Sequence, residues 1–288
     1  MSRTLRPGLV VARRDDGHLQ VGLDPPTRVV LPDSPEVRRV LTAVARATPP
    51  PAGPVADRVV TALESAGLLV DPAPRATVAG VAARARHGDD AARRLAARSA
   101  TTVSVDAPPE LLDQVHPLLR AAGLATATPS PATRGGSSVA TRPDATVVHL
   151  VLSTGPVLRE RLDGCLRAGV PHLPVAGRDG GCTVGPFVVP GRTGCLRCAD
   201  ARLAETDPRR AVVLEQVARA PAPAPDPVVL ALALAWAVRD LVAWAEGDRP
   251  STWGAAYELG GVVPVRTPVD VHPHCGCAWA DLGAARTA

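Results

Sequence analysis

Two cysteine pairs constrain the fold more than any other feature of the sequence. Cys195 and Cys198 are separated by two residues, and Cys275 and Cys277, much later in the chain, by one. Four thiolates in a tetrahedral arrangement are the preferred ligands of a structural zinc ion, whatever the sequence distance between the two pairs. The spacing therefore predicts a zinc site that ties the C-terminal region to the middle of the chain. Redox-active or simply reduced structural thiols are the alternative.

The remaining cysteines and the nearby histidines have less regular spacing. Cys165 and Cys182 lack a partner at ligand spacing, so we expect buried apolar thiols at both positions. His272 and His274 precede the second cysteine pair and are candidates for substitute ligands or for groups that support the ligands. Exposed loop histidines are the preferred interpretation of both.

Length and composition favour a globular chain. The 288 residues favour two domains, and 46% hydrophobic with 21% charged residues is typical of a chain with a packed core. The longest apolar run, Val228–Val238, is shorter than the roughly 18 residues that span a bilayer. No apolar stretch of signal-peptide length separates the first arginines. We expect a cytoplasmic protein without membrane contact.

The charge pattern disfavours nucleic acid as a partner. The formal charge is +4, and all basic residues are arginines that are scattered rather than clustered. No aromatic residue precedes Phe187, so the first half lacks a base-stacking platform. A winged-helix regulator that binds DNA is a third functional hypothesis, but the helix predicted over Val55–Ala66 carries only Arg58 against Asp57 and Glu64.

The first 74 residues read as a small domain of strands followed by helices. Short apolar or alternating segments predict three strands, and a helix start at Ser34 and a second apolar helical face follow. We expect a winged-helix-like peptide-recognition domain over residues 1–74. The predicted segments are Leu9–Ala12, Leu19–Leu23, Val29–Leu31, a helix after Ser34, a helix over Val55–Ala66 and a strand over Leu68–Val70.

An extended peptide can bind a domain of this kind by adding a strand to a sheet edge, with apolar residues as pockets and arginines to steer an acidic segment. The candidate groove lies between the third strand and the second helix. For single residues such as Val30 and Val59, burial in the core is the preferred alternative. The candidate peptide-binding residues are Arg28, Val29, Val30, Leu31, Arg58, Val59 and Leu63.

From Thr101 onward, strands and helices alternate, which is the pattern of a parallel α/β sheet. We expect a Rossmann-like domain over residues 75–288 that begins with an arginine-rich linker helix and contains the zinc knuckles. An apolar helix capped by Asp226 should lie in its core. The predicted segments are a linker over Asp71–Ala76, helices over Arg84–Arg98, Leu111–Arg120 and Val157–Ala168, strands over Thr101–Val105, Thr146–Leu152 and His172–Ala176, and a loop over Pro129–Pro143.

The motifs that bind nucleotide phosphates are missing from the sequence. No two glycines are two residues apart, so G-x-G-x-x-G cannot occur, and a Walker-type loop requires a lysine that the chain lacks. The residues after the first predicted strand include Asp106 and Glu110, whose charges repel phosphate. ATP is therefore not an expected cofactor.

Several segments carry a family resemblance: residues 171–175, the run Val184–Cys198, Asp207-Pro208 and His272–Cys277. Over residues 75 to 280 the chain resembles ubiquitin-activating and thiamine-biosynthesis (ThiF-like) adenylyltransferases. More narrowly, it resembles actinobacterial cyclodehydratase components, the leader-peptide-binding proteins of azoline-forming peptide pathways. The first 70 residues are similar to the peptide-recognition element of that family.

The resemblance implies a zinc-containing adenylyltransferase-like scaffold that captures a precursor leader peptide. Catalysis would come from a YcaO-type cyclodehydratase partner that uses ATP, and the chain itself would not be the enzyme. A homodimer of the chain is compatible with the resemblance. The alternative is an ATP-dependent adenylyltransferase with a divergent nucleotide loop, and the missing glycines and lysines argue against it.

Overall fold

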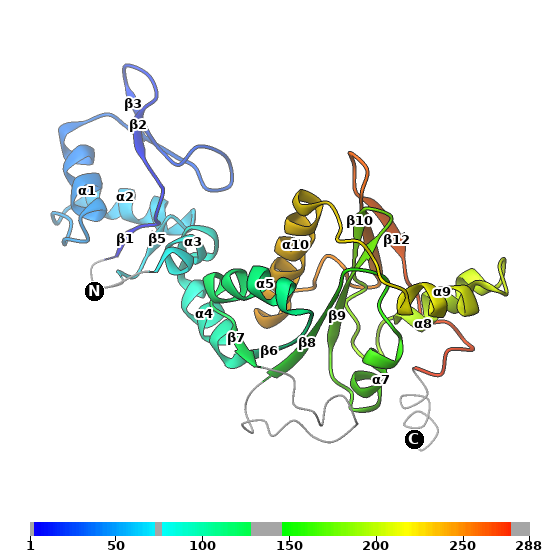
Figure 1. The fold of residues 1–288 in the computed structure, drawn as a ribbon. Helices are drawn as coiled ribbons and strands as arrows, with labels where there is room; N and C mark the ends of the chain where they lie inside the picture. Colours follow the sequence, from blue (N-terminus) through cyan, green and yellow to red (C-terminus); the bar gives the residue numbers. More distant parts are fainter. Residues whose placement is uncertain (1–2, 73–76, 128–145, 278–288) are drawn as a thin grey trace. The chain divides into compact units, whose positions relative to one another are not determined.

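The computed structural model describes residues 3–72, 77–127 and 146–277, and its contacts divide the chain into two compact units, Met1–Ala96 and Ala97–Ala288 (Figure 1). The predicted loop over 129–143 and most of the predicted linker over 71–76 lie outside the described residues. The functional boundary after residue 74 stays a prediction.

The N-terminal unit contains two small antiparallel sheets. Strands β2 (Val11–Arg13), β3 (His18–Val21) and β4 (Val29–Pro32) form a meander in the order β2-β3-β4. A second sheet pairs β1 (Thr4–Leu5) with β5 (Leu69–Val70). The predicted strands are present, and β4 is an edge strand among the described residues.

Two amphipathic helices complete the core of this unit. Helix α1 (Pro35–Ala45) begins at Ser34, whose hydroxyl accepts a hydrogen bond from the Val37 N–H at 3.2 Å. Helix α2 is Pro54–Ser65. Their apolar faces pack with residues of β3 and β4 in one buried cluster. The assignment of this unit as a winged helix stays a prediction.

The arginine-rich region forms two helices, so the prediction of one helix over Arg84–Arg98 is wrong. Helix α3 (Val78–His87) ends at Gly88, a 3-10 turn follows, and α4 (Ala91–Ala100) then begins. Gly88 has a φ of 59°, a conformation that ends the helix and that glycine adopts without strain.

The second unit is built on a seven-stranded sheet of order β12-β11-β10-β9-β8-β6-β7. Its parallel half confirms the expected α/β architecture. It contains β6 (Thr101–Asp106), β7 (Ala125–Ala127), β8 (Thr146–Ser153) and β9 (His172–Arg178).

The other half of the sheet is antiparallel, which the sequence reading missed. It contains β10 (Gly181–Val184), β11 (Ala255–Leu259) and β12 (Val265–Pro268). The reversal occurs at Asp179-Gly180, where both residues have positive φ values of 48° and 80°. This is the backbone of a two-residue hairpin turn, which folds β10 back along β9.

Helices cover both faces of the sheet. On one face, α5 (Pro109–Ala122) packs with α10 (Pro227–Ala245), and α10 contacts β9 and β10. Helix α7 (Glu160–Arg167) is shorter than predicted, and Leu162 packs against Val151 on the opposite face. Two further helices, α8 (Leu196–Ala204) and α9 (Arg210–Arg219), lie between β10 and α10 in the chain.

Helix α10 begins as the sequence predicts. The Asp226 carboxylate accepts hydrogen bonds from the N–H groups of Val228 and Val229 at 2.9 and 3.1 Å. By length and composition alone this helix could cross a membrane, with a mean hydropathy of 1.8. One face of it, including Leu234 and Leu241, is buried against the sheet, as in the core helix of a globular domain.

Candidate metal centre and peptide-binding edge

The first cysteine pair lies at the start of α8. Cys195 is the residue that caps the helix, and Cys198 lies in its first turn, where its N–H donates to the Cys195 carbonyl at 3.0 Å. The positive end of the helix dipole favours thiolates there. Both side chains are buried, each 1% exposed.

The second pair is held by a turn that His272 stabilises. The Cys275 N–H donates to the His272 carbonyl at 3.0 Å, and the His274 N–H donates to His272 Nδ1 at 3.2 Å. Nδ1 is therefore an acceptor, so His272 Nε2 carries the proton toward Glu205, 3.1 Å away. His272 is buried, which overturns its interpretation as an exposed loop residue, whereas His274 is exposed as expected.

The four thiols meet in one cluster, as the sequence predicts. The sulfurs of Cys195 and Cys198 are 3.7 Å apart, those of Cys195 and Cys275 are 3.5 Å apart, and those of Cys198 and Cys277 are 3.4 Å apart. All four sulfurs lie within 4.8 Å of one another. A zinc ion with bonds of about 2.3 Å to four sulfurs requires separations of about 3.8 Å. The cluster can hold a metal ion such as zinc.

The protonation of these thiols depends on their neighbours. A hydrogen bond from the Cys195 thiol lowers the pKa of Cys198 to about 4 and raises the pKa of Cys195 itself. Burial raises the pKa of Cys277 to about 12. Without a cation the cluster therefore retains protons, because several thiolates in one buried site repel one another. A bound dication would displace these protons.

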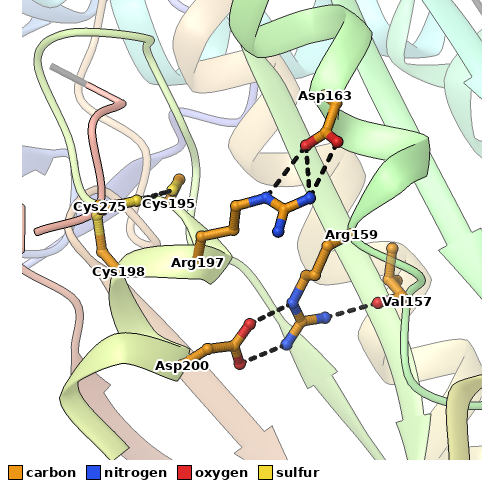
Figure 2. Close-up of polar contacts among 8 residues, drawn as sticks. All are labelled: Val157, Arg159, Asp163, Cys195, Arg197, Cys198, Asp200 and Cys275. Atoms are coloured by element: carbon orange, nitrogen blue, oxygen red, sulfur yellow. Dashed lines mark hydrogen bonds and ion pairs between the residues drawn. The ribbon is translucent and has the colours of Figure 1, made fainter. Parts of the chain in front are cut away.

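Two ion pairs fix the helix that carries the first cysteine pair (Figure 2). Arg197, between the two cysteines, donates to both oxygens of Asp163 on α7 at 2.9 Å. One turn further, Asp200 accepts hydrogen bonds at 2.6 and 2.7 Å from Arg159, which also donates to the Val157 carbonyl. These bidentate pairs position the metal-binding turn, and no spacing rule in the sequence indicates them.

The other two cysteines are buried, as predicted. Burial raises the pKa of both Cys165 and Cys182 to about 11. Neither belongs to the metal-binding cluster, and a thiol with such a pKa is a weak nucleophile at neutral pH.

The backbone of β4 exposes hydrogen-bonding groups at the edge of the N-terminal sheet. The Asp33 N–H donates to the carbonyl of Gly17, the residue before β3, at 2.7 Å, so Asp33 and Gly17 form a hydrogen-bonded pair of the ladder. Bonded and non-bonded pairs alternate along an antiparallel ladder, so Leu31 also bonds toward β3. Val30, at the intervening position, then directs its N–H and C=O away from β3, toward the open edge.

The side chains of the candidate peptide-binding residues fall into two groups. Arg28, just before β4, and Val30 on β4 are exposed, Val29 on β4 is half-buried, and Arg58 is exposed on α2. Leu31, Val59 and Leu63 belong to the hydrophobic core, with exposed fractions of 7%, 3% and 0%. The three buried side chains are therefore part of the core, and the exposed residues are the ones that a bound peptide could contact.

The place where a doubly wound sheet binds nucleotides is occupied by an internal ion pair. Asp106 is the last residue of β6, and its carboxylate accepts a hydrogen bond from Arg161 at 2.9 Å. The same guanidinium donates to the carbonyls of Asp106 and Leu152 at 3.0 and 3.2 Å. Arg161 thus spans the carboxyl ends of β6 and β8, where ligands of such sheets normally bind.

No protein-family model and no curated protein sequence matches the chain. Solved structures do. The heterocyclase TruD has a TM-score of 0.69 at 18% identity, covering 96% of this chain and 42% of that one. A heterocyclase in complex with substrate and cofactor gives 0.68 at 18% identity, with 96% and 39% covered. The microcin C7 biosynthetic enzyme MccB in complex with N-formylated MccA gives 0.62 at 12% identity, with 96% and 100% covered.

This chain therefore spans about two fifths of the heterocyclase chains and the whole of MccB. At these identities the likeness concerns the fold. The described residues adopt the fold that the MccB chain shares with the matching part of the heterocyclases.

Proposed function

We propose that the chain is a non-catalytic scaffold that binds the leader of a precursor peptide and presents the peptide to a YcaO-type cyclodehydratase in azoline biosynthesis. The observation that carries the proposal is the open edge of β4, where the Val30 N–H and C=O point away from β3. An extended leader would add as a strand there and gain backbone hydrogen bonds.

Charge at this edge fits an acidic leader. The guanidinium groups of Arg28 and Arg58 are exposed, and neither forms an ion pair within the described part of the chain. They would attract carboxylates at long range, an effect that salt weakens, while the backbone bonds and apolar contacts persist in salt.

The comparisons support a peptide-processing role. One of the similar structures is a heterocyclase in complex with substrate and cofactor, and another is MccB in complex with N-formylated MccA. The chain matches about two fifths of the heterocyclase chains, and in this proposal a YcaO-type partner performs the cyclodehydration.

In this proposal the cysteine cluster holds a structural zinc ion. All four ligand positions would be thiolates, so no open position would remain for substrate or water. The ion would fasten the segment after β12 to α8 and would take no part in the chemistry of the partner.

An ATP-dependent adenylyltransferase is the second candidate, because the chain matches MccB over its whole length. The ion pair between Arg161 and Asp106 argues against it, since it occupies the carboxyl ends of the strands and adds a carboxylate where phosphates would lie. The scaffold is the better supported function.

The test is affinity capture from the source cell with the full chain as bait. We expect a short precursor peptide and a YcaO-type protein in the captured material. A bait with Val30→Pro is the matched comparison and should lose the precursor while retaining its fold. Capture of neither molecule, or precursor capture that does not depend on Val30, would contradict the proposal.

A further inference from the structure

A hollow of about 390 Å³ opens in the second unit at the amino ends of β6 and β8. Thr101 and Thr146, the first residues of these strands, line it. It therefore lies at the opposite end of the strands from Asp106 and is separate from the usual nucleotide position. The other lining residues that bear on its chemistry are Arg192, Trp244, Asp248, Arg249 and Trp253.

The two arginines are held over one aromatic ring. The Cζ atoms of Arg192 and Arg249 lie 5.6 and 5.4 Å from the centre of the Trp253 ring. Trp253 stacks on Trp244 at 6.2 Å and on the fully buried Phe187 at 6.4 Å, so the ring has a fixed place in the core. Cation–π contact with a fixed ring restricts where the guanidinium groups can lie.

Donor groups in this hollow lack acceptors. Neither the Arg192 guanidinium nor the Arg249 guanidinium forms a hydrogen bond or ion pair in the parts of the chain that the structure describes. The Nε1 of Trp244 is buried and also has no acceptor there. Of these donors only the Trp244 Nε1 is buried, and a buried donor without an acceptor is uncommon in folded proteins. The guanidinium groups of Arg192 and Arg249 are exposed beside it.

The charge of the arginines selects the class of ligand. Two guanidinium groups bring positive charge to the hollow, which favours an anion. The planar fork of a guanidinium matches the two oxygens of a carboxylate, and the tryptophan rings offer apolar surface to an attached organic group. We propose that this hollow is a binding site for an organic carboxylate. The proposal goes beyond the scaffold function and does not depend on it.

The experiment titrates the full chain, at constant ionic strength and without carboxylate buffers, with N-acetyl-leucine, N-acetyl-leucinamide and inorganic phosphate. Tryptophan fluorescence and the Tm report binding. We expect saturable binding of N-acetyl-leucine, no binding of the amide, and binding of phosphate that is weaker by roughly tenfold. Equal binding of the amide, or preferential binding of phosphate, would overturn the assignment to carboxylates.

Variants locate the site. Arg192→Gln and Arg249→Gln should each weaken binding of N-acetyl-leucine by roughly tenfold, and Arg249→Lys should weaken it less because the charge remains. Arg266→Gln, at an exposed arginine of β12, is the matched control and should bind like the unaltered chain. Circular dichroism checks that each variant is folded. Trp253→Phe is a second test of the site: it removes the larger aromatic face under both arginines and should also weaken binding of N-acetyl-leucine. Unchanged affinity in the folded arginine variants would refute the site.

Discussion

The backbone of Gly194 lies so close to the carbonyl oxygen of Val269 that a Cβ atom on Gly194 would come within 2.4 Å of it. The Val269 N–H also donates to the Gly254 carbonyl at 2.9 Å, which fixes this segment against the end of the sheet. Gly194 directly precedes Cys195, and the segment of Val269 leads to Cys275. The contact between these two backbones therefore brings the two halves of the cysteine cluster together.

Gly194→Ala should push these segments apart. The added methyl group meets backbone rather than a flexible side chain, so we expect a loss of about 1–3 kcal/mol in the free energy of unfolding, together with reduced metal retention. Urea unfolding and metal analysis measure the two effects. Gly261→Ala is the matched control, because its Cβ would lie at an ordinary 3.7 Å from the nearest atom. Equal behaviour of both variants would contradict the role of this contact.

Purified protein should contain about one zinc ion per chain, and Cys275→Ser should remove it. The loss should expose the C-terminal segment to proteolysis, since formation of the site and local folding are coupled. Elemental analysis and limited proteolysis provide the readouts. Cys182→Ser, at a buried cysteine outside the cluster, should retain the ion. Metal-free protein whose four cluster thiols all react freely with alkylating agents is the result that would rule the site out.

Val30→Pro should abolish binding of the leader peptide. Proline lacks the N–H that points to the open edge of β4, so the added strand would lose a backbone hydrogen bond and meet the ring instead. Calorimetric titration of the full chain with candidate leaders measures the loss.

The control for this variant lies on the opposite edge of the same sheet. The Arg14 N–H donates to the His18 carbonyl, so Arg13, the adjacent residue of β2, points its N–H away from β3. Arg13→Pro likewise removes an outward-pointing N–H from that edge, and it should leave leader binding unchanged. Equal losses in both variants would show that the sheet as a whole, rather than the β4 edge, had been damaged.

Magnesium ATP should leave the Tm of the isolated chain unchanged. A nucleotide at a hundred times its Kd would stabilise the folded state by about 2.7 kcal/mol, which a thermal scan detects readily. The Asp106 carboxylate, which Arg161 holds at the end of β6, places negative charge where phosphates would lie. A clear rise in Tm, or pyrophosphate exchange that depends on a peptide, would favour the adenylyltransferase instead.

Acidification should destabilise the second unit through two buried histidines. His149 and His172 are partners in the register of β8 and β9, and burial lowers the pKa of both, that of His172 to about 4. In the unfolded chain a histidine has a pKa of about 6.5, so below that pH the unfolded state binds more protons. Stability is complete above pH 6.5 and is lost as the pH falls toward 4.

For His172 alone the expected loss is about 2 kcal/mol between pH 7.5 and pH 5. Urea unfolding at the two pH values measures it. His172→Leu should reduce this difference because it removes the titrating ring, at the cost of the hydrogen bond that Nδ1 donates to the Val170 carbonyl at 3.0 Å. A pH dependence that persists in His172→Leu would assign it to other groups.

The sequence by itself determined the features that depend on neighbouring residues. Ser34 and Asp226 cap their helices because their side chains reach N–H groups two or three residues away. The sequence favours burial of Val30 and Val59 in the core, which is confirmed for Val59 but wrong for Val30, which is 41% exposed. Alternation indicates which side of an element a residue occupies but not whether another segment covers it.

Only the tertiary structure decided how distant segments meet. The spacing of the two cysteine pairs predicted all four ligands of a metal site, but only the fold shows that the approach of Val269 to Gly194 brings the pairs together. Arg161 and Asp106 carry no mutual signal in the sequence, and their contact arises because α7 lies beside the carboxyl end of β6. Local sequence patterns predict hydrogen bonds between residues a few positions apart. These contacts join segments that are far apart in the chain, and no periodicity in the sequence indicates that they meet.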